Sequence, residues 1–237
     1  MKITILGIII LAMTSAACQQ PATTNSTTHS NQTVVTNTNA ATAINSAPAN
    51  TTNAAVNDNM AGTTAHEAMD HGSMQSSSNA QSAPFDLQFL DTMIAHHQGA
   101  IDMAQMAVQK TQNAALKQFA QKIIDDQKKE ISQMKSWREK WYVGKPEALN
   151  MEMPGMRDSM KMMTADEMKK MEAASGKDFD LMFLDMMTPH HVGAVEMAKD
   201  ALKRAEHPEI KQISESIIRA QEKEIAQMNQ WKTQWSK

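Results

Sequence analysis

The chain repeats one pattern of residues without a gap, and this repeat constrains the fold more than any other feature. The stretch MIAHHQGAIDMA ends at Ala104 and returns as MTPHHVGAVEMA, which ends at Ala198, so the offset is 198 minus 104, or 94 residues. The later stretch 123–141 returns at 217–235 with the same offset. An ungapped repeat of this length indicates a duplicated structural unit, so an element predicted in one half is predicted in both.

Each unit is predicted to be a pair of antiparallel helices. Phe89, Met93, Ala100 and Met103 recur at three- and four-residue spacing around the paired histidines, which places them on one helical face. The first helix is expected at about 85–111 and the second at about 114–141, with a short polar break between them that makes them antiparallel neighbours. Two such hairpins predict an all-α fold, a four-helix bundle.

The N-terminal segment is typical of an exported protein. Lys2, an apolar run and the small residues Ser15, Ala16 and Ala17 form an export signal, and the only cysteine, Cys18, follows directly. A cysteine at this place is the pattern of a bacterial lipoprotein, and ordinary cleavage before it is the alternative. We therefore expect a protein of the periplasm or cell envelope, whose only membrane contact would be a lipid anchor at Cys18. A single cysteine excludes an internal disulfide.

Composition divides the chain further. Thr, Asn, Ser and Ala dominate residues 18–83, which predicts a disordered tether, because such a segment cannot bury enough apolar surface to fold. The expected divisions are a signal peptide at 1–17, the tether at 18–83, a first hairpin at 84–141, a methionine-rich linker at 142–177 and a second hairpin at 178–237. Within the linker, a short helix is expected after Thr164 as its N-cap.

The paired histidines are the first candidates for chemistry. Adjacent helical residues point about 100° apart, so one histidine of each pair is expected to face the core and the other to sit at a flank. The turn of the hairpin brings them level with Gln127 and Glu130 on the second helix. The resulting candidate ligands are Met93, His96, His97, Glu130 and Met134 in the first unit and Met187, His190, His191, Glu224 and Met228 in the second.

Methionine is the compositional outlier, with 22 residues, and many of them lie outside the predicted long helices. The linker run MEMPGMRDSMKMM holds more methionines than core packing is expected to use, so it is interpreted either as a set of sulfur ligands or as a cap over the bundle. Its candidate ligands are Met153, Met156 and Met160. The end of the tether, HEAMDHGSM, adds a second candidate metal-capture segment with His66, Met69, His71 and Met74.

This ligand set favours a soft metal ion. Thioether sulfur suits Cu(I) and Ag(I), and imidazole suits copper in several states. Zinc sites more often use cysteine or several histidines, and calcium or magnesium sites need oxygen clusters. A di-iron site of the ferritin type would need a glutamate three residues before a histidine, and none stands there.

Other interpretations stay open. A buried histidine beside a glutamate is often a satisfied core pair, so a structural or protein-interaction bundle without tight metal binding is the alternative function. An enzyme is disfavoured, because the sequence has no nucleophile–base pair, phosphate-binding loop or haem-attachment motif. The net charge is -3 with acidic and basic residues interspersed, so nucleic acid is not an expected partner.

The motifs FDLQFLDTMIAHHQGAIDMA and MPGMRDSM…MTADEMKK…GKDFDLMFLDMMTPHHVGAVEMA, with a later QxxEIxxMxxW pattern, resemble the bacterial domain-of-unknown-function family 305. The resemblance covers residues 84–235 and implies a ferritin-like helical bundle, export and, as in some members, periplasmic copper binding. Ala95 departs from the family, in which proline usually precedes the histidine pair, as Pro189 does. The motif positions implied by the resemblance are Asp86, Met93, His96, His97, Met103, Glu130 and Met134, and Asp180, Met187, His190, His191, Met197, Glu224 and Met228.

Together these observations predict an exported helical bundle that binds Cu(I), with Ag(I) as a mimic. Its role would be copper buffering, resistance or transfer to an efflux or carrier protein, without catalysis. The bundle would hold the internal sites, while the linker and the tether would serve as exposed, weaker capture arms. Neutral thioethers need no deprotonation, so methionine ligands are expected to bind even where acid protonates histidine.

Overall fold

The computed structural model describes residues 74–237, and this part of the chain is helical, as predicted. No helix in it is long and apolar enough to cross a membrane. The elements are η2 (Ala80–Ser82), α1 (Phe85–Lys110), α2 (Ala114–Trp141), α3 (Met156–Met160), η3 (Lys161–Met163), α4 (Ala165–Ala173), α5 (Gly176–Arg204) and α6 (Pro208–Trp235).

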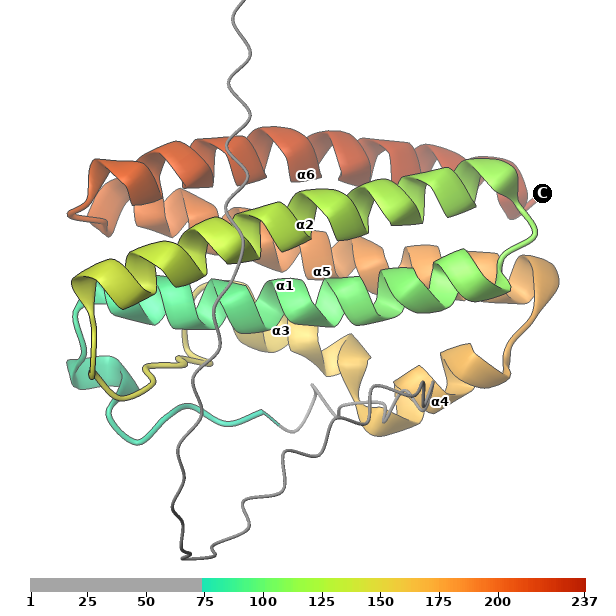
Figure 1. Cartoon of the computed structure of the whole chain (residues 1–237). Coiled ribbons are helices and arrows are strands. Elements are labelled where there is room, and N and C mark those ends of the chain that lie inside the picture. The colour runs from blue at the N-terminus through green and yellow to red at the C-terminus, as the bar shows by residue number, and fades with distance from the viewer. Residues whose placement is uncertain (1–73) are drawn as a thin grey trace, which may run out of the picture. The chain divides into compact units, whose positions relative to one another are not determined.

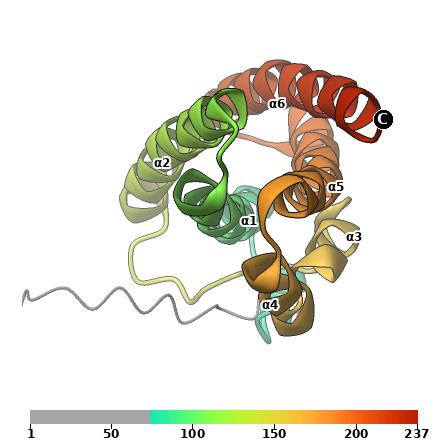
Figure 2. The same cartoon turned by 90° about the vertical axis from the view of Figure 1, so that its right-hand side faces the viewer.

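The four long helices form a bundle of two hairpins, α1 with α2 and α5 with α6 (Figure 1). Helices α1 and α5 contact each other and form the middle of the bundle. Seen end-on, α2 and α6 lie on one side of this central pair, and the short helices α3 and α4 lie on the other (Figure 2). The central helices are therefore covered on both sides, and the linker between the repeats supplies one of the two covers.

Local sequence signals account for the helix boundaries. The Asn113 side chain accepts hydrogen bonds from the backbone N–H groups of Ala115 and Leu116, which caps the start of α2. Pro208 occupies the first turn of α6, where a missing N–H costs nothing. Thr164 accepts a hydrogen bond from the N–H of Glu167 and caps α4, which confirms the predicted N-cap.

The linker methionines correct one expectation. Met151, Met153, Met156, Met160 and Met163 are each 6% exposed or less and belong to the core, so the linker is not an exposed capture arm. The reason is that α1 and α5 have a second apolar side, and flexible methionine side chains fill the irregular space over it. Of the two interpretations of the run, packing supports the cap, and a sulfur-ligand role for Met153, Met156 and Met160 stays a prediction.

The C-terminal end of the tether gives a second correction. The Ser77 N–H donates to the Leu149 carbonyl at 2.8 Å, and the Met151 N–H donates to Ser76 Oγ at 2.9 Å. Met74 is half-buried against the core. Residues 74–83 are therefore ordered along the linker, where its main chain offers hydrogen-bond partners. The candidate ligands His66, Met69 and His71 lie outside the described residues.

Helix α6 begins at a carboxylate that comes from the other repeat. Asp86, at the start of α1, accepts hydrogen bonds from the N–H groups of Glu206 and His207, the latter at 2.9 Å, and contacts His207 Nδ1 at 2.6 Å. The His207 ring in turn stacks on Trp141 at a centroid distance of 3.8 Å. The motif aspartate is thus a cap that joins the two repeats. Its counterpart Asp180 has a buried Oδ1 without a hydrogen-bond partner in the described part of the chain.

Replacing Asp86 with alanine is expected to lower the free energy of unfolding by about 1–2 kcal/mol, because the first N–H groups of α6 lose their acceptor. Asp180→Ala is the matched control in the other repeat, and we expect it to cost less, since it removes a buried oxygen that has no partner. Urea unfolding of both variants measures the difference. An equal loss in both would mean that the Asp86 contacts do not stabilise α6.

Two glycines let the linker approach the central helices. A Cβ on Gly193 of α5 would lie 2.5 Å from the Ser159 Cβ and 2.6 Å from the Gly155 carbonyl oxygen, which is too close for any side chain. A Cβ on Gly99 of α1 would meet the end of the Met163 side chain instead, at 2.9 Å from Cε. Gly193 therefore faces main chain, whereas Gly99 faces a flexible group that can move.

Gly193→Ala is expected to destabilise the fold by about 1–3 kcal/mol, because α3 must move away from α5. Gly99→Ala is the control: Met163 can shift, and alanine gains up to about 1 kcal/mol of helix propensity over glycine. Thermal and urea unfolding followed by circular dichroism compare the two. If Gly193→Ala were as well tolerated as Gly99→Ala, the close approach of α3 would be contradicted.

Candidate metal centre

The second histidine of each pair contacts a glutamate within its own hairpin. His97 Nε2 of α1 lies 2.7 Å from Glu130 Oε2 of α2, and His191 Nε2 of α5 lies 2.9 Å from Glu224 Oε2 of α6. Both rings are fully buried. The predicted alignment of histidine and glutamate across the hairpin is confirmed in both repeats.

The first histidine of each pair faces the other repeat. The rings of His96 and His190 stack across the α1–α5 contact, with centroids 3.8 Å apart and planes 34° apart, and His96 Nε2 lies 3.0 Å from Ser159 Oγ of α3. The expectation that one histidine of each pair sits at a flank is wrong. All four histidines are buried, because the linker turns the flank into a second interior.

The linker covers the two repeats with different groups. Over Gly99, Met163 Sδ and His190 Nε2 would lie 3.1 and 3.4 Å from an added Cβ, so a thioether and an imidazole both lie next to this glycine. Over Gly193 the corresponding place is taken by Ser159 and the Gly155 carbonyl. Sequence reasoning did not single out Met163 or Ser159. The methionine run could have indicated Met163, whereas no sequence signal indicated Ser159.

The second histidine of each pair keeps one ring nitrogen without a partner. His97 Nδ1 and His191 Nδ1 are buried and form no hydrogen bond with any of residues 74–237. A proton on Nδ1 would therefore be buried and unsatisfied, which is costly. The neutral tautomer that donates Nε2–H to the glutamate leaves a lone pair on Nδ1, and this is the form in which imidazole binds metals.

A lysine makes the electrostatics of the two pairs different. Lys122 Nζ of α2 lies 3.1 Å from Glu224 Oε1 and also pairs with Asp126 on its own helix. Burial by itself raises the pKa of Glu224, but the hydrogen bonds and charges of His191 and Lys122 outweigh it, so the pKa lies below its ordinary value. Glu224 is thus held as a carboxylate that accepts from both neighbours.

The predicted thioether ligands line the same interior. Within residues 74–237, no three His, Cys, Asp or Glu side chains converge as a metal site. Met228 Sδ lies 3.9 Å from Thr188 Oγ1, one turn before His191. The candidate methionines are all fully buried in the core: Met93, Met103, Met134, Met187, Met197 and Met228.

The arrangement suits capture of a soft cation better than acid–base catalysis. The Nδ1 atoms of His97 and His191 and neutral thioethers lie in a buried interior, and Glu130 and Glu224 already contact these histidines. Soft ligands of this kind select monovalent copper and silver over magnesium or calcium.

Comparison with solved structures finds proteins that hold such metals. CopM in the Cu(I)-bound form is 37% identical over 63% of this chain and 96% of that chain, with a TM-score of 0.53. CopM in an Ag-bound form, obtained by soaking, is 37% identical over 63% and 96% of the two chains, with a TM-score of 0.52. A DUF305 protein from Streptomyces coelicolor, described as secreted, is 29% identical over 65% and 93%, with a TM-score of 0.58.

A comparison with curated protein sequences gives no match. The family described as "Domain of unknown function (DUF305)" matches twice, over residues 12–138 and 86–232. These two matches overlap and together cover most of the chain, in agreement with the resemblance of its motifs. The chain belongs to the DUF305 family.

Proposed function

We propose that this protein binds Cu(I), and Ag(I) as its mimic, in the interior of the helical bundle. The observation that carries the proposal is the pair of buried imidazoles, His97 and His191, whose Nδ1 atoms have no hydrogen-bond partner while their Nε2 atoms contact glutamates. Structures of the similar protein CopM with Cu(I), Cu(II) and Ag bound support it.

The two glutamates act on the metal through the histidines. Glu130 and Glu224 accept the Nε2–H of His97 and His191, which fixes the ring orientation and leaves Nδ1 as the ligand atom. Buried thioethers complete the coordination. Because thioethers are neutral, they neither repel the cation nor require loss of a proton on binding, so the metal is held without a large pH dependence of the sulfur ligands.

The metal is cargo in this proposal, and the protein is not an enzyme. Labile thioether and imidazole ligands suit copper buffering, resistance or transfer to an efflux or carrier protein. Export to the periplasm or cell envelope agrees with the N-terminal sequence and with the relative described as secreted. A lipid anchor at Cys18 rests on the N-terminal sequence alone. Because the linker is packed on the bundle, its methionines are not exposed for early capture of metal. We therefore assign early capture to the tether histidines His66 and His71.

Changing His97 and His191 together to glutamine is expected to remove about two equivalents of tightly bound Cu(I), one for each repeat. Glutamine can still donate a hydrogen bond to the glutamate, so the fold is expected to persist while the ligand nitrogen is lost. An anaerobic titration of the full chain against a chromophoric Cu(I) chelator measures the change, and circular dichroism checks the helix content.

A matched variant changes His96 and His190 to glutamine, and it separates the stacked pair from the glutamate-bound pair. Retained binding in this variant and loss in the first would assign the metal to the Nδ1 atoms of His97 and His191. Undiminished binding in the first variant would contradict the proposed site. If the unaltered protein bound no Cu(I) tightly, the alternative would hold, a structural or protein-interaction bundle.

A further inference from the structure

The two histidine–glutamate pairs are repeated in sequence but not in their surroundings. Glu224 is covered by Lys122, which reaches across from α2. The residue equivalent to Lys122, 94 positions later, is Ser216 on α6. Its side chain is short and uncharged, so it cannot form an ion pair with Glu130. Within residues 74–237, Glu130 forms an ion pair with His97 alone.

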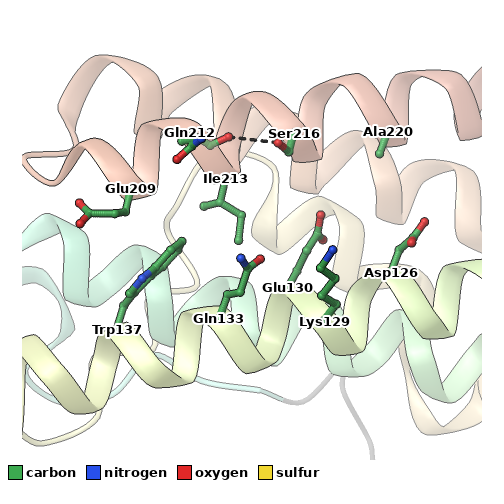
Figure 3. A pocket seen from close by; sticks show the side chains of 10 residues that line it. All are labelled: Asp126, Lys129, Glu130, Gln133, Trp137, Glu209, Gln212, Ile213, Ser216 and Ala220. Carbon is green, nitrogen blue, oxygen red and sulfur yellow. Dashed lines mark hydrogen bonds between the residues drawn. The ribbon is translucent and has the colours of Figure 1, made fainter. Parts of the chain in front are cut away.

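A groove lies on the α2–α6 side of the bundle, over Glu130. Its volume is about 430 Å³, and Figure 3 shows Glu130 directed from α2 toward α6, with Ser216 and Ala220 opposite. The Glu130 side chain is 16% exposed, against 10% for Glu224. The groove therefore leads to an oxygen of Glu130, and the ring of His97 lies directly behind it.

Three replacements between the repeats account for the groove. At the equivalent place beside Glu224, Phe119 packs edge-on against Trp231 with centroids 5.1 Å apart, and the Lys122–Asp126 pair lies on the surface. The counterparts of Phe119, Lys122 and Asp126 are smaller. They are Ile213, Ser216 and Ala220, and all three line the groove.

The charge of the groove favours a cation. Asp126, Glu130 and Glu209 line it together with one lysine, Lys129. Lys122 pairs with Asp126, and the three carboxylates still outnumber these two ammonium groups. A recess lined mainly by one sign of charge raises the local concentration of the opposite ion and speeds its arrival. At the other pair, an arriving cation meets the ammonium group of Lys122 first.

We propose that the α2–α6 groove is the access route by which a soft monovalent cation reaches His97, and that Lys122 closes the corresponding route to His191. This inference rests on the proposed function and adds an order of loading to it. The cation first meets Glu130 at the groove and then moves past the Glu130–His97 contact to Nδ1, which lies on the opposite edge of the imidazole ring from the Nε2 that contacts Glu130. At the second repeat, the Lys122 ammonium must leave the Glu224 carboxylate before a cation can follow the same path.

Substoichiometric titration of the full chain with Ag(I), followed through the imidazole ¹⁵N resonances of His97 and His191, tests the proposal. In the unaltered protein, His97 is expected to respond first. Lys122→Ser gives the second repeat the residue of the first, and we expect His191 occupancy to rise by about two- to fivefold, the size of one partly exposed ion pair. Ser216→Lys is the reciprocal change, and it is expected to shift the response of the His97 resonance to a higher Ag(I) concentration.

Lys199→Ser is the matched control, because Lys199 is similarly exposed and pairs with Glu222, outside both histidine–glutamate pairs. It is expected to leave the order of loading unchanged. If both histidines responded together in the unaltered protein, or if Lys122→Ser left the order unchanged, Lys122 would not control access. If Ag(I) moved neither resonance, the proposed function would fail and the loading order with it.

Discussion

Burial of four imidazoles beside the α1–α5 contact is the constraint on which the rest of this structure depends. Each ring brings two polar nitrogens into a helical core, where an unsatisfied polar group is costly. His97 and His191 meet this cost in part through glutamates of their own hairpins, which fixes how α1 packs on α2 and α5 on α6. His96 Nε2 meets it through Ser159 Oγ, and the His96 ring stacks on that of His190, so these contacts join the two hairpins and the linker. The Nδ1 atoms of His97 and His191, which have no hydrogen-bond partner within residues 74–237, are where we propose that a metal is held.

The methionine-rich linker belongs to the same arrangement. By packing α3 and the following turn over the central helices, it turns two flank histidines into buried ones and places Met163 beside His190. The many methionines therefore have a packing role that does not depend on metal. A flexible thioether that fills a gap can also turn toward a soft cation, so the packing role and the ligand role use the same property of the side chain. The glycines at 99 and 193 make this close approach sterically feasible.

Sequence reasoning predicted the features that are repeated and missed those that are not. The 94-residue offset and the helical spacing located all four long helices, and the hairpin geometry placed His97 opposite Glu130. Contacts between the repeats have no such signal, so two of them were not foreseen. They are the stacking of His96 on His190 and the capping of the start of α6 by Asp86 of α1. The burial of the linker was misread, because a methionine-rich run looks exposed until the second apolar side of α1 and α5 is known. The sequence shows that Ser216 stands in the second repeat where the first has Lys122, but only the fold shows which glutamate each residue faces.

The measurement that tests the account most directly is anomalous diffraction from crystals of the Cu(I)-loaded protein, collected at the copper edge. The account predicts anomalous density within bonding distance of Nδ1 of His97 and of His191, each with a methionine sulfur nearby and with the Nε2–glutamate contacts retained. Density only at surface methionines, or only on the carboxylates with the imidazoles unaltered, would contradict the claim that the buried histidines are the metal ligands.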